Sequence, residues 1–192
     1  MTALHLDPTK TALVIIDLQK GIVAAPTVPH SVADVLQRSS RLANAFREKG
    51  ATVVYVRVDM ANPLSLPVDS PARDPNAPPP PVSASELVPE SGVRPEDLIV
   101  TKRHWGAFAG TSLEQELRRR GVDTVVLTGI STNIGVESTA RQGTGLGLAF
   151  VIVEDACAGR DANDHRWSFE KIFPRLARVR TTDEVIAALT EE

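Results

Sequence analysis

The sequence predicts an α/β protein: a single three-layer α/β/α domain with a mainly parallel, Rossmann-like sheet of roughly six strands. Short runs rich in β-branched residues alternate along the chain with segments whose apolar residues recur at helical spacing. The middle runs are apolar at nearly every position, which is typical of parallel strands buried on both faces. A chain of 192 residues can bury one substantial core but is short for two domains, so we expect one domain over residues 1–192.

The individual elements follow from these patterns. The segments 31–50 and 111–121 have helical spacing and stop at glycines, as helices commonly do. The predicted strands are 12–17, 52–58, 98–101, 123–129, 149–155 and a short sixth at 177–180. The predicted helices are 31–50, 111–121, 134–146, 163–173 and 182–189. In parallel sheets of this kind, functional sites lie beyond the carboxyl ends of the strands.

One segment, 59–96, does not fit the alternation of strands and helices. It holds 10 of the 14 prolines, including four in a row at 78–81. Proline fixes φ and removes a backbone donor, so this segment is expected to be neither helix nor sheet. Two interpretations stay open: a solvated loop without a role, or a stiffened lid or oligomer arm over the strand ends.

Composition excludes several classes of function. Hydrophobic residues make up 42% and charged residues 23% of the chain, which is typical of a globular protein. The net charge of −3 and the pI near 5.8 argue against nucleic-acid and anionic-membrane partners. The apolar runs are only strand-sized, and residues 1–10 lack a secretion signal. With a single cysteine, Cys157, the chain is expected to be cytoplasmic.

Three candidate site features come at predicted strand ends. Asp17 closes the first strand, Lys102 follows the third, and a Gly129–Gly135 turn leads from the fourth strand into a helix. A carboxylate beside an apolar run is expected to have a raised pKa, and the first N–H groups of a helix can bind an anion. Read singly, each could instead be a turn, surface or capping residue. Their convergence at one edge predicts a site for a small molecule.

These segments together resemble the isochorismatase-like hydrolases, also called cysteine hydrolases, over nearly the whole chain. The resemblance rests on TALVIIDLQKGIV (11–23), on the stretch from VTKRHWGAF to the turn GISTNIGVESTA (100–140), and on VIVEDACAG (151–159). It implies that Asp17 and Lys102 are catalytic and that Gly135 stands where most members have a nucleophilic Cys. It further implies a cis peptide between Ile130 and Ser131, no cofactor, and assembly into a homo-oligomer, a dimer or a tetramer.

Glycine at this position is also found in the isochorismatases of the family, which hydrolyse a vinyl ether without a nucleophilic side chain. By resemblance, Asp17 is expected to act as a general acid of raised pKa and Lys102 to bind a carboxylate or steady the charge on Asp17. Two alternatives remain open: an amide or C–N hydrolase that uses activated water, and an inactive member that only binds. Cys157 lies 22 residues beyond Gly135 and is expected to be a small buried filler.

Further residues are candidates for substrate binding, each with a plain structural alternative. Gln19 could be a turn residue, Arg57 a salt-bridge partner, and Trp105 and Phe108 packing residues or a subunit contact. Ser131 and Thr132 could merely cap the helix that follows. The predicted substrate-binding set is therefore Gln19, Arg57, Trp105, Phe108, Ser131 and Thr132.

Two further kinds of site have partial signals in the sequence. The nicotinamidase branch carries an Asp and two His after its second strand, but here Asp59 is followed by no His, so we expect no catalytic metal. Ser131, Asp155 and His165 occur in the chain order of an α/β-hydrolase triad, although the elbow motif is incomplete and the spacing is compressed. His165 is expected on a helix surface.

Overall fold

The computed structural model describes residues 4–71, 73–74 and 76–189, and its centre is one parallel sheet. Six strands lie in the order β3-β2-β1-β4-β5-β6, and each neighbouring pair is parallel. The strands are β1 (Thr11–Ile16), β2 (Thr52–Val58), β3 (Leu98–Lys102), β4 (Thr124–Ile130), β5 (Ala149–Ala158) and β6 (Arg178–Arg180). The predicted α/β fold with a six-stranded sheet is therefore confirmed.

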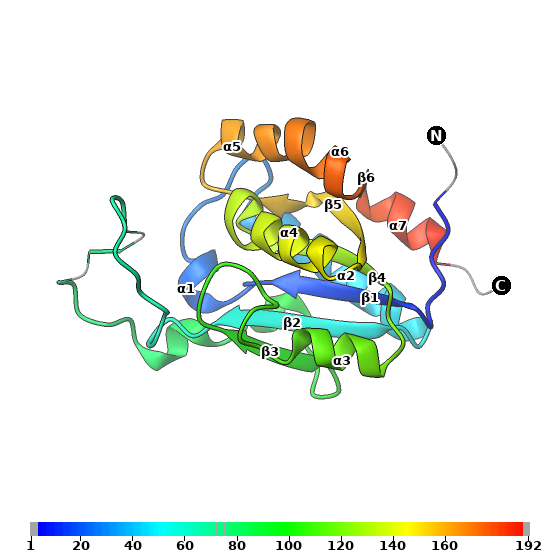
Figure 1. The fold of residues 1–192 in the computed structure, drawn as a ribbon, viewed down its shortest axis with the longest axis horizontal. Helices are drawn as coiled ribbons and strands as arrows, with labels where there is room; N and C mark the ends of the chain where they lie inside the picture. Colours follow the sequence, from blue (N-terminus) through cyan, green and yellow to red (C-terminus); the bar gives the residue numbers. More distant parts are fainter. Residues whose placement is uncertain (1–3, 72, 75, 190–192) are drawn as a thin grey trace.

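Helices cover both faces of the sheet and give it three layers (Figure 1). On one face lie α2 (Val32–Glu48) and α7 (Thr182–Ala188). On the other face lie α3 (Leu113–Arg119), α4 (Glu137–Gly145) and α6 (Phe173–Leu176). All six residues of β1 are buried, and the five after Thr11 alternate between the two apolar clusters, which is why this run is apolar at every position.

The helical segments around the turn after β4 and near the C-terminus are less regular than predicted. The segment predicted at 134–146 begins with a π-helix, η3 (Thr132–Val136), before α4 starts. The segment predicted at 163–173 is divided into α5 (Ala162–Trp167), a second π-helix η4 (Ser168–Ile172) and α6. Pro174 stands in the first turn of α6, where its missing N–H does not interrupt an established helical ladder. The short helix α1 (Lys20–Val23) was not predicted.

The proline-rich arm, residues 59–96, has an outer and an anchored part; its residues 72 and 75 lie outside the described residues. The outer part projects beyond the carboxyl ends of β1 and β2 (Figure 1). The anchored part contains two short 3-10 helices, η1 (Val82–Ser85) and η2 (Pro89–Ser91), and returns to the sheet. There Val88 N–H donates to the Leu18 carbonyl at 3.1 Å, and Lys20 N–H donates to the Glu86 carbonyl at 2.9 Å. The arm is thus fixed beside the end of β1.

Within the described part of the chain, every helix is too short or too polar to pass through a bilayer.

Candidate active site

Asp17 lies where β1 ends, and its backbone turns the chain sharply. Its φ of 58° is in the left-handed region, which Asp tolerates better than most residues. The Asp17 N–H still donates to the Val56 carbonyl of β2 at 2.8 Å, while its own carbonyl accepts from Gln19 N–H at 2.8 Å. The strand hydrogen bonding therefore continues up to Asp17 and stops there, which places the carboxylate at the carboxyl edge of the sheet.

Lys102, the last residue of β3, reaches Asp17 across the end of the intervening strand β2. Its Nζ lies 2.8 Å from Asp17 Oδ2 and donates to the Trp105 carbonyl at 2.6 Å. Both charged residues are buried, with exposed fractions of 6% for Asp17 and 2% for Lys102. A buried charge is tolerated when it is paired, and this pair also brings together two strands that are not neighbours.

The Asp17 carboxyl is unusual in its pKa and in its second oxygen. Burial raises the pKa of Asp17 from 3.8 to about 6, and the Lys102 ammonium opposes part of this rise. Oδ2 is held by Lys102, whereas the buried Oδ1 has no hydrogen-bond partner among the described residues. When protonated, Oδ1 would be a buried hydrogen-bond donor, and the pKa of the carboxyl group is close to neutral pH. This combination suits a general acid.

Gly135 lies directly against the Asp17–Lys102 pair. A Cβ at this position would lie 3.1 Å from Asp17 Oδ2, 3.3 Å from Lys102 Nζ and 2.9 Å from Ile16 Cγ2. These separations are shorter than ordinary side-chain contacts. The ion pair therefore lies next to Gly135, and a side chain at this position would press on Ile16 and on both members of the pair.

The turn between β4 and α4 brings Gly135 to the pair. Gly129 has a φ of 127°, and a Cβ there would collide with the Ile16 carbonyl oxygen, so only glycine lets β4 approach β1 this closely. The peptide bond between Ile130 and Ser131 is cis. The Ser131 carbonyl then accepts from the N–H groups of Ile134 and Val136, both at 3.2 Å, which closes the wide turn of η3.

A buried hydroxyl connects this turn with the loop after Lys102. Thr139 of α4 donates its hydroxyl hydrogen to the Gly135 carbonyl at 2.6 Å. The Thr139 hydroxyl oxygen in turn accepts from the Ala107 N–H at 3.1 Å. The loop that supplies the Trp105 carbonyl to Lys102 is thus joined to the turn that carries Gly135.

The structure places the predicted substrate-binding residues in different environments. Trp105 is 59% exposed, whereas Phe108 is buried in the apolar cluster beneath α4. Arg57 donates through Nε to Thr101 on the neighbouring strand. Ser131 is half-buried at the start of the turn, and Thr132 is fully buried behind it.

Gln19 has a structural role that the sequence did not suggest. Its side-chain NH2 donates to the carbonyls of Val58 and Ala84 at 3.0 and 3.1 Å, and its Oε1 accepts from the Val58 N–H at 2.7 Å. Both amide hydrogens are therefore used to hold the arm against the end of β2. A hydrogen bond between Gln19 and a substrate stays a prediction.

The predicted surface position of His165 is wrong, and the structure does not assemble the triad of Ser131, Asp155 and His165. His165 is 4% exposed, and its Nδ1 lies 2.8 Å from Thr132 Oγ1 rather than at Ser131. Asp155 instead accepts hydrogen bonds from the N–H and hydroxyl of Thr182. His165 of α5 thus contacts Thr132, the residue that follows Ser131 in the turn.

Cys157 and Asp59, which the sequence also raised as candidates, have structural roles. Cys157 is fully buried in β5 beside Gly129, and burial raises the pKa of its thiol. Asp59 caps a turn, since its carboxylate accepts from the N–H groups of Ala61 and Asn62. Neither is a member of the group formed by Asp17, Lys102 and Gly135.

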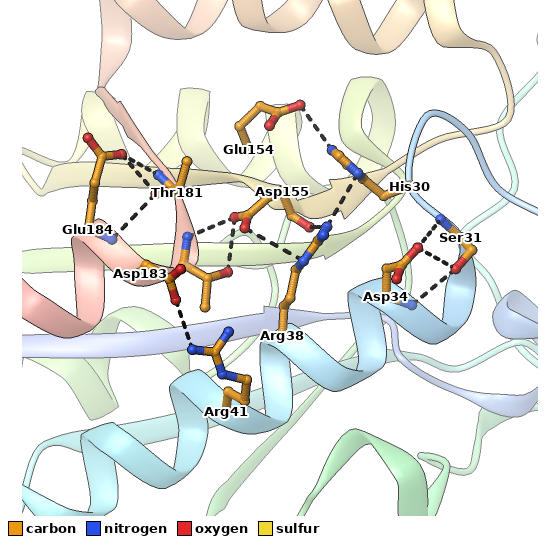
Figure 2. A network of polar contacts seen from close by, with 11 residues as sticks. His30, Ser31, Asp34, Arg38, Arg41, Glu154, Asp155, Thr181, Asp183 and Glu184 are labelled. Atoms are coloured by element: carbon orange, nitrogen blue, oxygen red, sulfur yellow. Dashed lines mark hydrogen bonds and ion pairs between the residues drawn. The ribbon is translucent and has the colours of Figure 1, made fainter.

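Among the described residues, one group has the donor atoms for a metal ion: His30, Glu154 and His165, whose ligand atoms lie within 4.8 Å of one another. Figure 2 shows His30 between Glu154 and Arg38. No local pattern in the sequence indicates this group, because 124 residues separate His30 from Glu154. Through His165 this second polar cluster contacts Thr132 in the turn after β4.

The parallel sheet, the buried Asp–Lys pair at its carboxyl edge and the adjoining turn define an isochorismatase-like hydrolase. The chain belongs to the isochorismatase family, whose domain matches residues 11–184. It is 46% identical over 198 residues to the uncharacterized isochorismatase family protein YecD of Escherichia coli O157:H7. The matched region covers 97% of this chain and 100% of that protein.

Solved structures agree with this assignment. An isochorismatase family protein from Burkholderia thailandensis is 42% identical, with a TM-score of 0.91 and coverage of 98% of this chain and 99% of that one. A cysteine hydrolase from Pseudomonas syringae pv. phaseolicola 1448A is 25% identical, with a TM-score of 0.80 and coverage of 98% and 97%. The protein is therefore an isochorismatase-family hydrolase.

Proposed function

We propose that this hydrolase belongs to a glycine-for-cysteine branch of the family and cleaves a vinyl ether of the isochorismate type without a covalent nucleophile. The observation that carries the proposal is the Asp17 carboxyl, whose buried Oδ1 has no partner among the described residues and whose pKa is raised to about 6. A carboxyl in this state can donate a proton at near-neutral pH. Gly135 supports the proposal because a nucleophilic side chain would compete with the ion pair for the same space.

The proposed reaction begins with transfer of the Asp17 proton to the terminal CH2 carbon of the enolpyruvyl group. The electron pair of the C=C bond forms the new C–H bond and leaves an oxocarbenium ion. Water then adds to the carbon that carries the ether oxygen, and its surplus proton returns to the Asp17 carboxylate. In the resulting hemiketal, the bond between the former enol carbon and the ether oxygen breaks, and the hydroxyl proton passes to that oxygen, which stays on the ring. The products are pyruvate and a ring diol.

Lys102 would serve this reaction in two ways. Its Nζ stays 2.8 Å from Asp17 Oδ2, where it stabilises the carboxylate that forms after proton transfer. The Asp17 carboxylate and the Trp105 carbonyl accept two of the three ammonium hydrogens among the described residues, so the third can serve a substrate carboxylate. For a second carboxylate of the substrate we propose Arg57, which lies next to the end of β2.

The exposed Trp105 ring, Phe108 and the turn residues Ser131 and Thr132 are proposed to shape the substrate pocket around this pair. Trp105 is anchored through its carbonyl to Lys102, so its position depends on the ion pair. The proposed chemistry needs no cofactor, because proton transfer and water addition use only a carboxyl group and solvent.

A second candidate is an amide or C–N hydrolase that attacks with activated water, and similarity to a cysteine hydrolase favours it. Against it, Gly135 supplies no thiol, and the one cysteine, Cys157, is buried with a raised thiol pKa. A third candidate is a member that only binds its ligand. A buried acid with a raised pKa next to an ammonium gives a pure binder no advantage, which favours the catalytic proposals.

The test is pyruvate release from isochorismate, coupled to lactate dehydrogenase, in the wild type, Asp17→Asn and Asp123→Asn. Asp123 is an exposed Asp at the opposite edge of the sheet, just before β4, and serves as the matched control. We expect turnover in the wild type and in Asp123→Asn, and a loss of at least 100-fold, on the order of a general acid's contribution, in Asp17→Asn. Absence of wild-type turnover, or full activity of Asp17→Asn, would reject the proposal.

A further inference from the structure

The His30–Glu154–His165 group makes a directed set of hydrogen bonds. Both His30 Nε2 and His165 Nε2 lie 3.1 Å from the same oxygen, Glu154 Oε1. On the far side of His30, the Arg38 guanidinium lies 3.3 Å from Nδ1. Figure 2 shows His30 between Arg38 and Glu154. On the far side of His165, Thr132 Oγ1 lies 2.8 Å from Nδ1.

The partners fix which ring nitrogens carry hydrogen. Arginine only donates, so His30 Nδ1 must accept and its Nε2–H must donate to Glu154. The hydrogen bond from His165 is the main cause that lowers the pKa of Glu154 to about 2, so Glu154 is ionised near neutral pH. An ionised carboxylate can only accept hydrogen bonds. His165 therefore donates through Nε2–H, and in the neutral ring its Nδ1 accepts from the Thr132 hydroxyl.

This arrangement disfavours a metal ion, although the three side chains have suitable donor atoms. A metal would need the lone pairs of both Nε2 atoms, which would move the His30 hydrogen to Nδ1 and point it at Arg38. Metal-binding histidines normally donate their second N–H to an acceptor such as a carboxylate or carbonyl, and a guanidinium cannot accept. The group is better described as a hydrogen-bonded support for Thr132.

Thr132 is the residue through which this support reaches the active site. It is fully buried and is the first residue of η3, the π-helix that contains Gly135. The next residue, Asn133, donates its side-chain N–H to Asp164 of α5 at 2.9 Å. On the other side of the turn, Thr139 holds the Gly135 carbonyl. The turn is thus held between α5 and the loop after Lys102.

From these contacts we infer that His165 is a positioning residue: by accepting from Thr132 it holds the turn so that Gly135 stays packed against the Asp17–Lys102 pair. The inference rests on the proposed function in one respect, since it assigns His165 to the same reaction. His165 itself does not touch the reacting atoms. Its effect is to keep the Gly135 backbone close to Asp17, which excludes water from the carboxyl and keeps the general acid in place.

Two substitutions at His165 separate its two hydrogen bonds. In His165→Asn the side-chain oxygen stands near the position of Nδ1 and can still accept from Thr132, while the bond to Glu154 is lost. In His165→Gln the side-chain nitrogen stands near Nε2 and can donate to Glu154, while the acceptor for Thr132 is lost. Thr132→Ser, which keeps the hydroxyl, and Thr132→Val, which removes it at similar volume, form the matched pair on the other side.

The first readout is the pKa of the Asp17 carboxyl, followed by 13C NMR, because it does not depend on any substrate. We expect the raised value in the wild type, His165→Asn and Thr132→Ser, and a fall towards 3.8 in His165→Gln and Thr132→Val, where water reaches the carboxyl. In the wild type, 15N shifts should also show His165 with hydrogen on Nε2 and not on Nδ1. An Nδ1–H tautomer, or a metal bound at one equivalent, would overturn the inference without any variant.

The second readout is kcat and KM for pyruvate release. His165→Gln should lose roughly 10- to 100-fold in kcat with little change in KM, as expected when catalytic groups are misplaced, while His165→Asn stays within about threefold. Unchanged Asp17 pKa values in folded His165→Gln and Thr132→Val would overturn the inference. If the pKa pattern holds but the wild type releases no pyruvate, the positioning role stands and only the proposed reaction fails.

Discussion

The two oxygens of the Asp17 carboxyl have different surroundings, and this difference defines the site at the scale of single residues. Oδ2 is neutralised by Lys102, while the buried Oδ1 has no partner in the described part of the chain. Pairing alone would lower the pKa of an Asp, but burial is the larger effect here and raises it to about 6. A carboxyl of this kind can both donate a proton and take one back.

The raised pKa of Asp17 predicts how activity changes with pH, and the direction follows from its role as general acid. A general acid must be protonated, so activity should be full below pH 6 and should fall about tenfold for each pH unit above the pKa. The measurement is kcat/KM for pyruvate release between pH 4.5 and 9, with the stability of the protein checked at each pH. A rate that stays constant or rises through this range would show that Asp17 does not act as the acid.

Adding one methyl group at Gly135 should damage the site. In Gly135→Ala the new Cβ must displace Asp17, Lys102 or Ile16, and overpacking of this kind costs about 1–3 kcal/mol. We expect a lower melting temperature and a loss of at least tenfold in kcat, roughly what a small displacement of the acid produces. The control is Gly145→Ala at the end of α4, where a Cβ would meet nothing within 4 Å.

Gly145→Ala should keep wild-type activity and be as stable as the wild type or slightly more so. Equal effects of the two substitutions would indicate that the space at Gly135 is not specifically required. Gly135→Cys tests the same space with the residue that most family members carry. We expect it to lose activity in the same way, because the added side chain would press on Ile16 and on the ion pair.

At the scale of elements, α2 begins with a capping box formed by Ser31, the residue before the helix, and Asp34. The Ser31 hydroxyl accepts from the Asp34 N–H at 3.1 Å, and the Asp34 carboxylate accepts from the Ser31 N–H at 3.2 Å. Ser31→Ala should lower the free energy of unfolding by about 1 kcal/mol. Ser112→Ala, at the start of α3, is the control, because Ser112 makes no side-chain cap hydrogen bond.

Chemical denaturation of both variants gives the comparison. The difference should appear in the midpoint without a change in the slope. If Ser112→Ala destabilised the protein as much as Ser31→Ala, the cap at Ser31 could not be the cause of the effect.

Strands were predictable because their residues carry a local signal. The β-branched run of β1 and the run of β4 gave both strands to within a residue at each end. The turn after β4 was harder, because a single π-helical turn is too short to show an apolar spacing of its own. The hydrogen bond from the Val136 N–H to the Ser131 carbonyl reveals it only in the structure. The helix α1 has only four residues, too few to show a periodic pattern.

The whole molecule explains which parts of the site could be predicted. Asp17, Lys102 and Gly135 converge because parallel strands place all their carboxyl ends at one edge, so a sequence position implies a place in space. His165 was misplaced because its environment depends on Thr132 and on Glu154 of a neighbouring strand, and no local pattern reports such contacts. The structural role of Gln19 was missed for the same reason, since its partners are 39 and 65 residues away.

The prediction that the protein forms a homo-oligomer is best tested at the arm. Leu64, Leu66 and Val68 are 52%, 65% and 62% exposed on its outer part, an arrangement typical of a surface that another chain covers. Replacing all three with Ser should reduce the mass found by sedimentation equilibrium while leaving the melting curve of the dilute protein unchanged. A wild type that is monomeric at every concentration would contradict the prediction.

The most direct test of the central claim is the destination of water oxygen during turnover of isochorismate in H2 18O. The pyruvate should be trapped at once as lactate by lactate dehydrogenase, and both products analysed by mass spectrometry. Addition of water to the oxocarbenium carbon predicts the label in the C2 oxygen of lactate and none in the ring diol. Label in the diol would mean that water attacks the ring carbon, and it would contradict vinyl ether hydrolysis initiated by Asp17.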